Sequence, residues 1–207
     1  MIKTINAPLA FLQKDDISTD EIIPSRFLLT TSVEGLGKGL FHDLRYDSDN
    51  KLKEDFVLNK PPFQSGCVLV TGRNFGCGSS REHAAWALKE FGVEAIVSES
   101  AATNFDRNAA HNNLPVIKIS KENVGLLERL ATTEPEVLLA SINLGDRKLI
   151  TATDCQISFS LSRLQEEFLS SPIPDIDRAL AQKNEIAKTW SRLAHNIRGR
   201  SPSMSGK

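Results

Sequence analysis

The sequence has 207 residues, of which 40% are hydrophobic and 25% charged, a balance typical of a globular protein with a sizeable core. Its formal net charge of -1 gives no electrostatic reason to expect nucleic acid or an anionic membrane as a partner. No apolar run approaches the ~20 residues of a membrane-spanning helix, and the N-terminus lacks the apolar core and cleavage site of a signal peptide. We therefore expect a cytoplasmic protein.

The three cysteines, Cys67, Cys77 and Cys155, are widely spaced and form neither a C-x-x-C pair nor a zinc-ligand pattern. An iron–sulfur cluster usually draws three or four thiolates from compact motifs, so the pattern argues against a cluster held by this chain alone. We expect reduced thiols and no metal bound by this chain.

The N-terminal part of the chain is predicted to hold little regular structure. A short strand precedes a polar turn at residues 14–16, and Pro24 argues against a long element after it. Residues 30–60 combine closely spaced glycines with mostly polar residues, which predicts a long loop with at most short helices. Loops of this length often serve as lids or binding loops.

The middle of the chain is more regular. A buried strand at 67–72, a helix with Ser79 or Ser80 as N-cap and Gly92 as C-cap, and a strand at 93–100 form a β-α-β unit. Such a unit has a right-handed crossover, so its two strands should be parallel. The pattern therefore predicts an α/β fold.

Regular elements continue towards the C-terminus. We expect a helix ending at Asn112 and Asn113, a strand at 114–120, a helix at 121–133 and a β-hairpin over 136–160 that turns at residues 144–146. Helices are expected over about 161–198, and residues 201–207 form a polar tail that we expect to be disordered.

The stretch that joins the first strand of the β-α-β unit to its helix is the strongest candidate for a functional site. Its glycines lead into Ser79, Ser80 and Arg81 at the start of the helix. Such a loop aims backbone N–H groups and the positive end of the helix dipole at one point, where hydroxyls and a guanidinium also bind carboxylate or phosphate. The sequence therefore predicts an anion site without choosing the anion.

Familiar motifs do not fit this loop. The P-loop needs a lysine after Gly78, the dinucleotide fingerprint needs glycine where Arg81 stands, and the hydrolase elbow needs glycines two residues before and after its serine. Taken alone, the pattern favours a tight turn in which Ser79 caps the helix and Arg81 is a surface charge.

The segment NFGCGSSREHAAWAL resembles the signature of the small subunits of 3-isopropylmalate dehydratase, in the aconitase superfamily. The likeness runs in order over about residues 5–190: DISTDEIIPSRFL is similar to the family's early T-D-x-I-I-P segment, and SESAATNFDRNAAHNNLPVI to its stretch leading into R-N-A and a L-P strand. The resemblance implies a swivelling β/β/α domain, equivalent to the C-terminal domain of aconitase, with a helical C-terminal extension. It also implies one such domain over residues 1–200.

The resemblance further implies an activity shared between two chains. In this family the small subunit acts with a large subunit that holds a [4Fe–4S] cluster. Together they interconvert 2-isopropylmalate and 3-isopropylmalate through isopropylmaleate, in leucine biosynthesis. The implied partners are that large subunit and a dicarboxylate substrate, with no cofactor on this chain, no nucleic acid and no membrane. A homo-oligomer of the isolated chain stays open.

Roles follow by matching positions. Ser79 matches the family's catalytic base, and Asp20 matches an early aspartate near it that we also count as catalytic. Ser80 and Arg81 match residues that bind a substrate carboxylate, and Gly78 belongs to the same binding loop. A serine base needs stabilisation of its alkoxide, which the helix N-terminus, loop N–H groups and Arg81 can supply. Cys77 matches the family's G-C-G and is expected to pack or turn the loop.

The candidate substrate-side-chain loop departs from the family pattern. Many relatives carry a basic residue after an aromatic residue and a leucine, whereas this chain has Phe27, Leu28, Leu29 and Thr30. Arg26 either compensates for that residue or is a solvated charge. An apolar Leu29 suits an isopropyl group better than the extra carboxylate of homoaconitate. We count Arg26, Leu28, Leu29 and Thr30 as substrate-binding candidates.

Two alternatives remain open. One is the same machinery acting on another substrate, such as homoaconitate or a methylated citrate or malate. The other is a non-catalytic carboxylate-binding module. RNA binding, known in some aconitase relatives, fits poorly with the near-neutral charge and the lack of a Lys/Arg-rich stripe.

Overall fold

The computed structural model describes residues 4–28, 33–133 and 137–170. The chain divides into two units, residues 1–170 and 171–207, and the second lies outside the described residues. The predicted C-terminal helices therefore begin with α6 (Arg163–Ser170), while the rest of residues 161–198 and the tail at 201–207 lie outside this description. The single domain over residues 1–200 stays a prediction.

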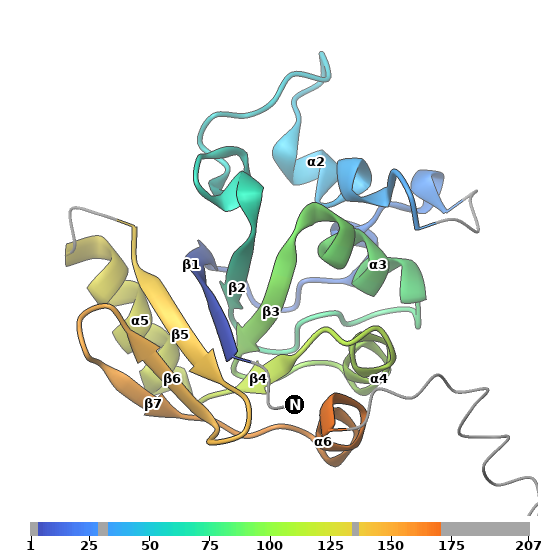
Figure 1. The fold of residues 1–207 in the computed structure, drawn as a ribbon. Coiled ribbons are helices and arrows are strands. Elements are labelled where there is room, and N and C mark those ends of the chain that lie inside the picture. Colours follow the sequence, from blue (N-terminus) through green and yellow to red (C-terminus); the bar gives the residue numbers. More distant parts are fainter. Residues whose placement is uncertain (1–3, 29–32, 134–136, 171–207) are drawn as a thin grey trace, which may run out of the picture. The chain divides into compact units, whose positions relative to one another are not determined.

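A seven-stranded sheet in the order β4-β3-β2-β1-β5-β6-β7 forms the centre of the first unit (Figure 1). Its parallel part contains β1 (Thr4–Leu12), β2 (Cys67–Thr71), β3 (Val93–Ser98) and β4 (Val116–Lys118). Its antiparallel part contains β5 (Leu139–Asn143), β6 (Lys148–Thr151) and β7 (Gln156–Ser158). The predicted hairpin is thus confirmed as β5 and β6, and β7 extends it.

Strand β1 joins the two parts. Its residues Thr4–Pro8 pair antiparallel with β5, and Leu9–Leu12 pair parallel with β2. The switch between partners lies in the middle of one strand, so the carboxyl end of β1 belongs to the parallel part. That end therefore lies beside the carboxyl ends of β2 and β3, where open α/β sheets bind ligands.

Helices cover both faces of the parallel strands. On one face lie α3 (Glu82–Phe91) and α4 (Thr103–His111), and on the other lies α5 (Lys121–Thr133) (Figure 1). Side chains of β2 alternate between two core clusters: Leu69 packs in the cluster of α3 and α4, and Val70 in the cluster of α5. Burial on both faces explains the unbroken apolar run that identified this strand. The predicted β-α-β unit is confirmed as β2, α3 and β3.

The prediction for the C-terminal end of α3 is confirmed, and the prediction for its N-terminal end is not. Gly92 is the C-cap, as predicted, with φ of 106° and an N–H that donates to the carbonyls of Leu88 and Lys89. The prediction of Ser79 or Ser80 as N-cap is wrong, because the helix begins at Glu82 and its N-cap is Arg81, without a side-chain capping bond. The Arg81 N–H donates to the Ser79 carbonyl at 2.9 Å, so a separate turn precedes the helix.

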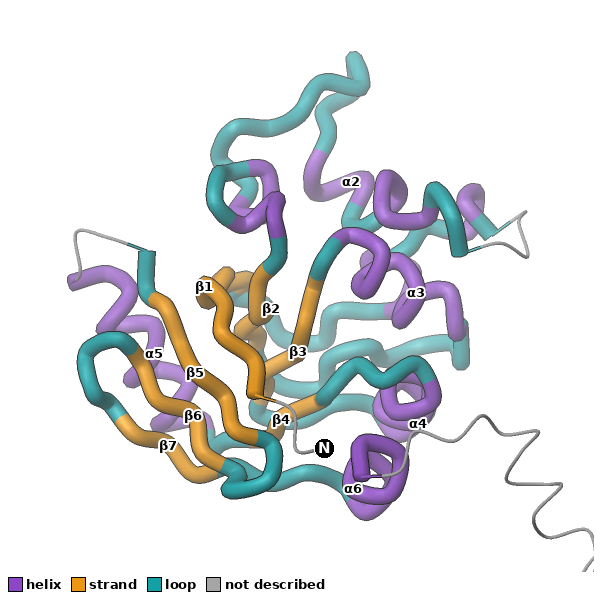
Figure 2. Tube along the Cα trace, in the orientation of Figure 1, coloured by secondary structure: helices purple, strands orange, loops and turns teal. Residues whose placement is uncertain are grey.

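Between β1 and β2, the helices among the described residues are all short, as predicted for residues 30–60 (Figure 2). These are α1 (Thr19–Ile22), η1 (Ser25–Phe27), η2 (Leu36–Gly39), α2 (His42–Arg45), η3 (Val57–Asn59) and η4 (Phe63–Ser65). None of the helices in the described part of the chain has the length and apolar character to cross a membrane.

Arg45 organises the segment that follows α1. Its side chain is buried, and its guanidinium donates to the carbonyls of Gly37 and Leu40 at 3.3 and 3.2 Å and to Asn59 Oδ1 at 3.0 Å. The guanidinium also lies 4.7 Å from the centre of the Phe91 ring at the end of α3. Burial lowers the pKa of Arg45, so these contacts compensate for the lost hydration of its charge.

Replacing Arg45 by methionine removes these donors and leaves buried carbonyls without them. We expect the free energy of unfolding to fall by about 2–4 kcal/mol. Arg147→Met is a matched control, because Arg147 is half-exposed and pairs with Glu166 Oε1 at 2.6 Å, which predicts a loss below about 1 kcal/mol. Urea denaturation followed by circular dichroism measures both losses, and equal losses would contradict the assigned role.

Candidate active site

Three loops meet at the carboxyl ends of β1, β2 and β3. The loop after β2 donates from the N–H groups of Gly76 and Cys77 to the carbonyl of Ile17, in the loop after β1, at 2.7 and 3.2 Å. The Phe75 N–H donates to the carbonyl of Ser100, in the loop after β3, at 3.0 Å. The candidate loop is therefore held on both sides by backbone hydrogen bonds.

The base of this loop is packed into the core. Phe75 is fully buried, and its ring meets that of Phe105 edge-on with centroids 5.0 Å apart. Gly76 has φ of 73°, and a Cβ there would lie 2.2 Å from Phe105 Cγ. Gly78 has φ of 93°, but the nearest atom to its Cβ position is Thr19 Oγ1 at 3.6 Å. Gly76 is thus required by space and by conformation, and Gly78 by conformation alone.

Polar contacts fix the side of the loop that faces β1. Arg73 donates from Nε to Asp15 Oδ2 at 3.2 Å and from Nη2 to Asp16 Oδ2 at 3.0 Å. Asn74 Nδ2 donates to Asp16 Oδ1 at 2.8 Å, and the Cys77 thiol donates to the Asp16 carbonyl at 3.3 Å. Cys77 therefore helps to hold the two loops together, in agreement with the structural role expected for it.

Ser79 lies at the exposed end of the loop, beside Thr19. Thr19 Oγ1 donates to the Ser79 carbonyl at 3.1 Å and lies 3.3 Å from Ser79 Oγ, while the Thr19 N–H donates to the Cys77 carbonyl at 2.8 Å. Sequence reasoning missed Thr19. The only available signal was its position before Asp20 in the T-D-x-I-I-P segment.

Arg81 and Asp20 form an ion pair across the same two loops, and Arg81 Nη1 also donates to the Ile23 carbonyl at 3.4 Å. The hydrogen bond from Arg81 holds the pKa of the Asp20 carboxyl below its ordinary value, against a weaker opposing effect of desolvation. Both side chains reach solvent. Because these contacts use Nη1 and a guanidinium carries five N–H donors, Arg81 has further donors to offer a carboxylate.

Gly78, Ser79 and Ser80 are exposed, and Arg81 is partly exposed. The contact of Thr19 with Ser79 and the ion pair of Asp20 with Arg81 bring the predicted residues of the two segments close to one another. The turn closed by the Arg81 N–H and the Ser79 carbonyl sits directly before α3. This places Ser79 and Ser80 at the positive end of the helix dipole, where an anion is favoured.

Arg26 is engaged elsewhere. Its guanidinium forms an exposed ion pair with Asp43 of α2, and Nη2 lies 2.9 Å from His42 Nδ1. The hydrogen bond with Asp43 raises the pKa of Arg26, and the charge of Asp20 adds a smaller effect in the same direction. Leu28 is partly buried against the α3 core cluster. Leu29 and Thr30 lie outside the described residues, so the substrate-binding roles of residues 26–30 stay predictions.

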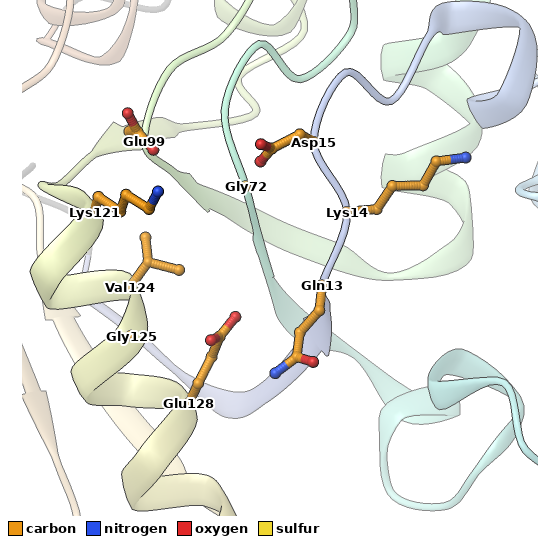
Figure 3. Close-up of a pocket in the computed structure, with 9 residues that line it drawn as sticks. All are labelled: Gln13, Lys14, Asp15, Gly72, Glu99, Lys121, Val124, Gly125 and Glu128. Atoms are coloured by element: carbon orange, nitrogen blue, oxygen red, sulfur yellow. The ribbon is translucent and has the colours of Figure 1, made fainter.

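A cavity of about 590 Å³ lies between the ends of β1 and β2 and helix α5 (Figure 3). Asp15, Glu99, Lys121 and Glu128 line it with charges of both signs, whereas the Lys14 side chain points away and pairs with Glu21. None of its lining residues is a predicted site residue, so the candidate catalytic group occupies a different face of these loops.

The thiols of this chain do not fit an iron–sulfur cluster. Burial raises the pKa of the Cys67 thiol to about 12, which disfavours the thiolate that iron requires. Cys67 and Cys155 pack against different core clusters, and the Cys77 thiol donates a hydrogen bond to the Asp16 carbonyl. Across the described ranges, no three His, Cys, Asp or Glu side chains are grouped so as to hold a metal ion.

Comparisons with known proteins point in one direction. The aconitase C-terminal domain family matches residues 5–122. A 3-isopropylmalate dehydratase small subunit from Caulobacter vibrioides is 39% identical over 183 residues, covering 88% of this chain and 90% of that protein. One from Roseiflexus castenholzii is 45% identical over 144 residues, covering 68% and 71%. A crystal structure of 3-isopropylmalate dehydratase from Methanocaldococcus jannaschii aligns with a TM-score of 0.66 at 26% identity, over 88% of this chain and 99% of that one.

The contact between Gly76 and Phe105 predicts unequal effects of two glycine substitutions. Gly76→Ala should lower the free energy of unfolding by about 3 kcal/mol or more, because it adds a clash to the cost of a positive φ. Gly78→Ala, with an equally left-handed φ but open space, should cost about 1 kcal/mol. Thermal and urea unfolding measure both, and a Gly78→Ala loss equal to that of Gly76→Ala would contradict the packing argument.

The pair of Arg81 and Asp20 predicts a titration result. In the wild type the Asp20 carboxyl should titrate below its ordinary value of 3.8, and Arg81→Gln should move its pKa upward because the charged donor is lost. Since the folded-state pKa is the lower one, the pair stabilises the protein above the ordinary pKa, and this contribution disappears as pH falls through the folded-state value. Carbon-13 NMR titration of Asp20 measures the shift. Arg147→Gln, far from this pair in the sequence, should leave Asp20 unchanged.

Proposed function

The chain belongs to the aconitase C-terminal domain family and, within it, to the small subunits of 3-isopropylmalate dehydratase, and from this premise we propose that it supplies the proton-transfer half of that enzyme's active site. With a separate large subunit it interconverts 2-isopropylmalate and 3-isopropylmalate through isopropylmaleate, in leucine biosynthesis. The observation that carries the proposal is the pair of exposed serines, Ser79 and Ser80, directly before a partly exposed Arg81 that is paired with Asp20.

Ser79 is the proposed base. It removes a proton from the carbon next to a substrate carboxylate. The electron pair of that C–H bond forms the double bond of isopropylmaleate as hydroxide leaves the neighbouring carbon. The reverse steps add water in the other orientation. A serine hydroxyl is normally too weak an acid for this role, so the positive end of α3 and the neighbouring Arg81 must favour its alkoxide.

Arg81 and Ser80 are the proposed ligands of the substrate carboxylate. A guanidinium binds a carboxylate through two parallel N–H bonds, and it also withdraws charge from the carbon that loses its proton. Asp20 restricts the position of Arg81, since the ion pair links α1 to the turn before α3. The role of Asp20 is then to orient the guanidinium and to balance its charge before substrate arrives.

The remaining half of the site is proposed to lie on the large subunit. Ser79 and Ser80 face solvent in this chain, whereas proton abstraction from carbon requires a site from which water is largely excluded. A covering partner provides that exclusion. When bound there, a [4Fe–4S] cluster supplies a Lewis acid for the departing hydroxyl.

Substitution of Ser79 tests the proposed function. The chain is combined with a cognate large subunit, and turnover of 2-isopropylmalate and hydration of isopropylmaleate are measured. Ser79→Ala should lower kcat by about 10³-fold, the middle of the range for loss of a general base, with a smaller change in KM. Ser158→Ala, an exposed serine in strand β7 of the antiparallel part of the sheet, is the control and should leave both constants unchanged.

Two results would contradict the proposal. If Ser79→Ala retains activity, Ser79 is not the base. If the wild-type complex prefers homoaconitate or a methylated citrate or malate, the substrate is not 2-isopropylmalate. If the wild type binds dicarboxylates but no large subunit restores turnover, the non-catalytic binding module replaces the enzyme reading.

A further inference from the structure

The Thr19 hydroxyl is buried between two oxygen atoms of Ser79. Thr19 is 1% exposed, and its Oγ1 lies 3.1 Å from the Ser79 carbonyl oxygen and 3.3 Å from Ser79 Oγ. A buried hydroxyl has one hydrogen and two lone pairs. A carbonyl oxygen only accepts, so in the resting state Thr19 donates to the carbonyl and accepts from the Ser79 hydroxyl.

The position of this hydroxyl is fixed by its surroundings. The Thr19 N–H is bonded to the Cys77 carbonyl at 2.8 Å, and Ser18 and Glu21 form a capping box around the start of α1. Ile22, in the same short helix, is fully buried, and its carbonyl accepts from the Phe41 N–H at 2.7 Å. The β-branched side chain of Thr19 is itself restricted in χ1. Thr19 is therefore held beside Ser79 by contacts both with its own short helix and with the loop that carries Ser79.

Deprotonation of Ser79 changes which of its two oxygen atoms, the carbonyl oxygen or Oγ, is the stronger acceptor for the Thr19 hydroxyl. An alkoxide is a far stronger acceptor than a backbone carbonyl, and hydrogen bonds to charged groups are the stronger ones. Rotation of the Thr19 hydroxyl about its Cβ–Oγ1 bond then turns its hydrogen from the carbonyl to Ser79 Oγ. The same buried hydroxyl can serve both protonation states without movement of the backbone.

We propose that Thr19 is a positioning residue for the serine base: it orients the neutral Ser79 hydroxyl and donates a hydrogen bond to its alkoxide. This inference rests on the proposed function of Ser79. It predicts that loss of the Thr19 hydroxyl raises the pKa of Ser79, so that the acidic limb of the pH profile of kcat moves to higher pH. Charged and titratable groups on the adjoining elements (Asp20 and Glu21 on α1, Arg81, Glu82 and His83 at the start of α3) are unchanged in the test.

The test compares Thr19→Val with Thr19→Ser in the complex with the large subunit. Valine keeps the shape and removes the hydroxyl, and kcat should fall about 10- to 100-fold, the range for a hydrogen bond to a charged group. KM should change less than about threefold because Thr19 does not face substrate. Serine keeps the hydroxyl and should restore most of kcat and the position of the acidic limb.

A purely structural role predicts another pattern. If Thr19 only supports the Ser79 carbonyl, Thr19→Val lowers thermal stability and leaves the pH profile in place, which would overturn the inference. Should Thr19→Val fail to assemble, Thr19→Cys replaces it: its weaker donor should give an intermediate fall in kcat with the same direction of pH shift, and a wild-type profile would again overturn the inference. Full activity of Ser79→Ala would instead refute the base itself, so the two failures are distinguishable.

Discussion

The hydrogen bonds from Gly76 and Cys77 to the carbonyl of Ile17 are the contact on which the candidate site depends. They join two loops that are distant in the sequence but leave the sheet at the same edge, because β1 and β2 are parallel neighbours. Once the loops are joined, Thr19 falls beside Ser79 and Asp20 opposite Arg81. Neither pair exists within one segment, so the arrangement of the candidate site arises from the sheet topology.

The loop also changes character over a short length. Phe75 is fully buried against Phe105, while Ser79 and Ser80 are exposed. One end of the loop is thus anchored in the core and the other lies at the surface. An active site shared between two chains needs both properties. The proposed reactive groups are accessible, and the contacts of their loop hold them in place before the proposed second subunit binds, which lowers the cost of ordering them later.

Local patterns predicted the elements whose signals are local. The buried strand β2, the Gly92 C-cap and the turn at residues 144–146 all follow from composition and periodicity, and the structure has each of them. The prediction for the N-cap of α3 was wrong because a turn, closed by the hydrogen bond from the Arg81 N–H, comes before the helix. Thr19 was missed for a related reason: its value lies in a contact with a loop far along the chain, which no single-segment pattern contains. The resemblance to relatives named Ser79 and Arg81, but could not give their geometry.

The division of β1 between two partners has a consequence for synthesis on the ribosome. Both of its neighbours, β2 at Cys67–Thr71 and β5 at Leu139–Asn143, are translated later, and β5 much later. At about 5–20 residues per second, β1 waits several seconds as a nascent strand with open edges and apolar side chains, including Ile5 and Leu9, that are buried only in the finished sheet. The strand that joins the two parts of the sheet is thus translated before either of its partners, and its pairing is complete only after β5 has been made.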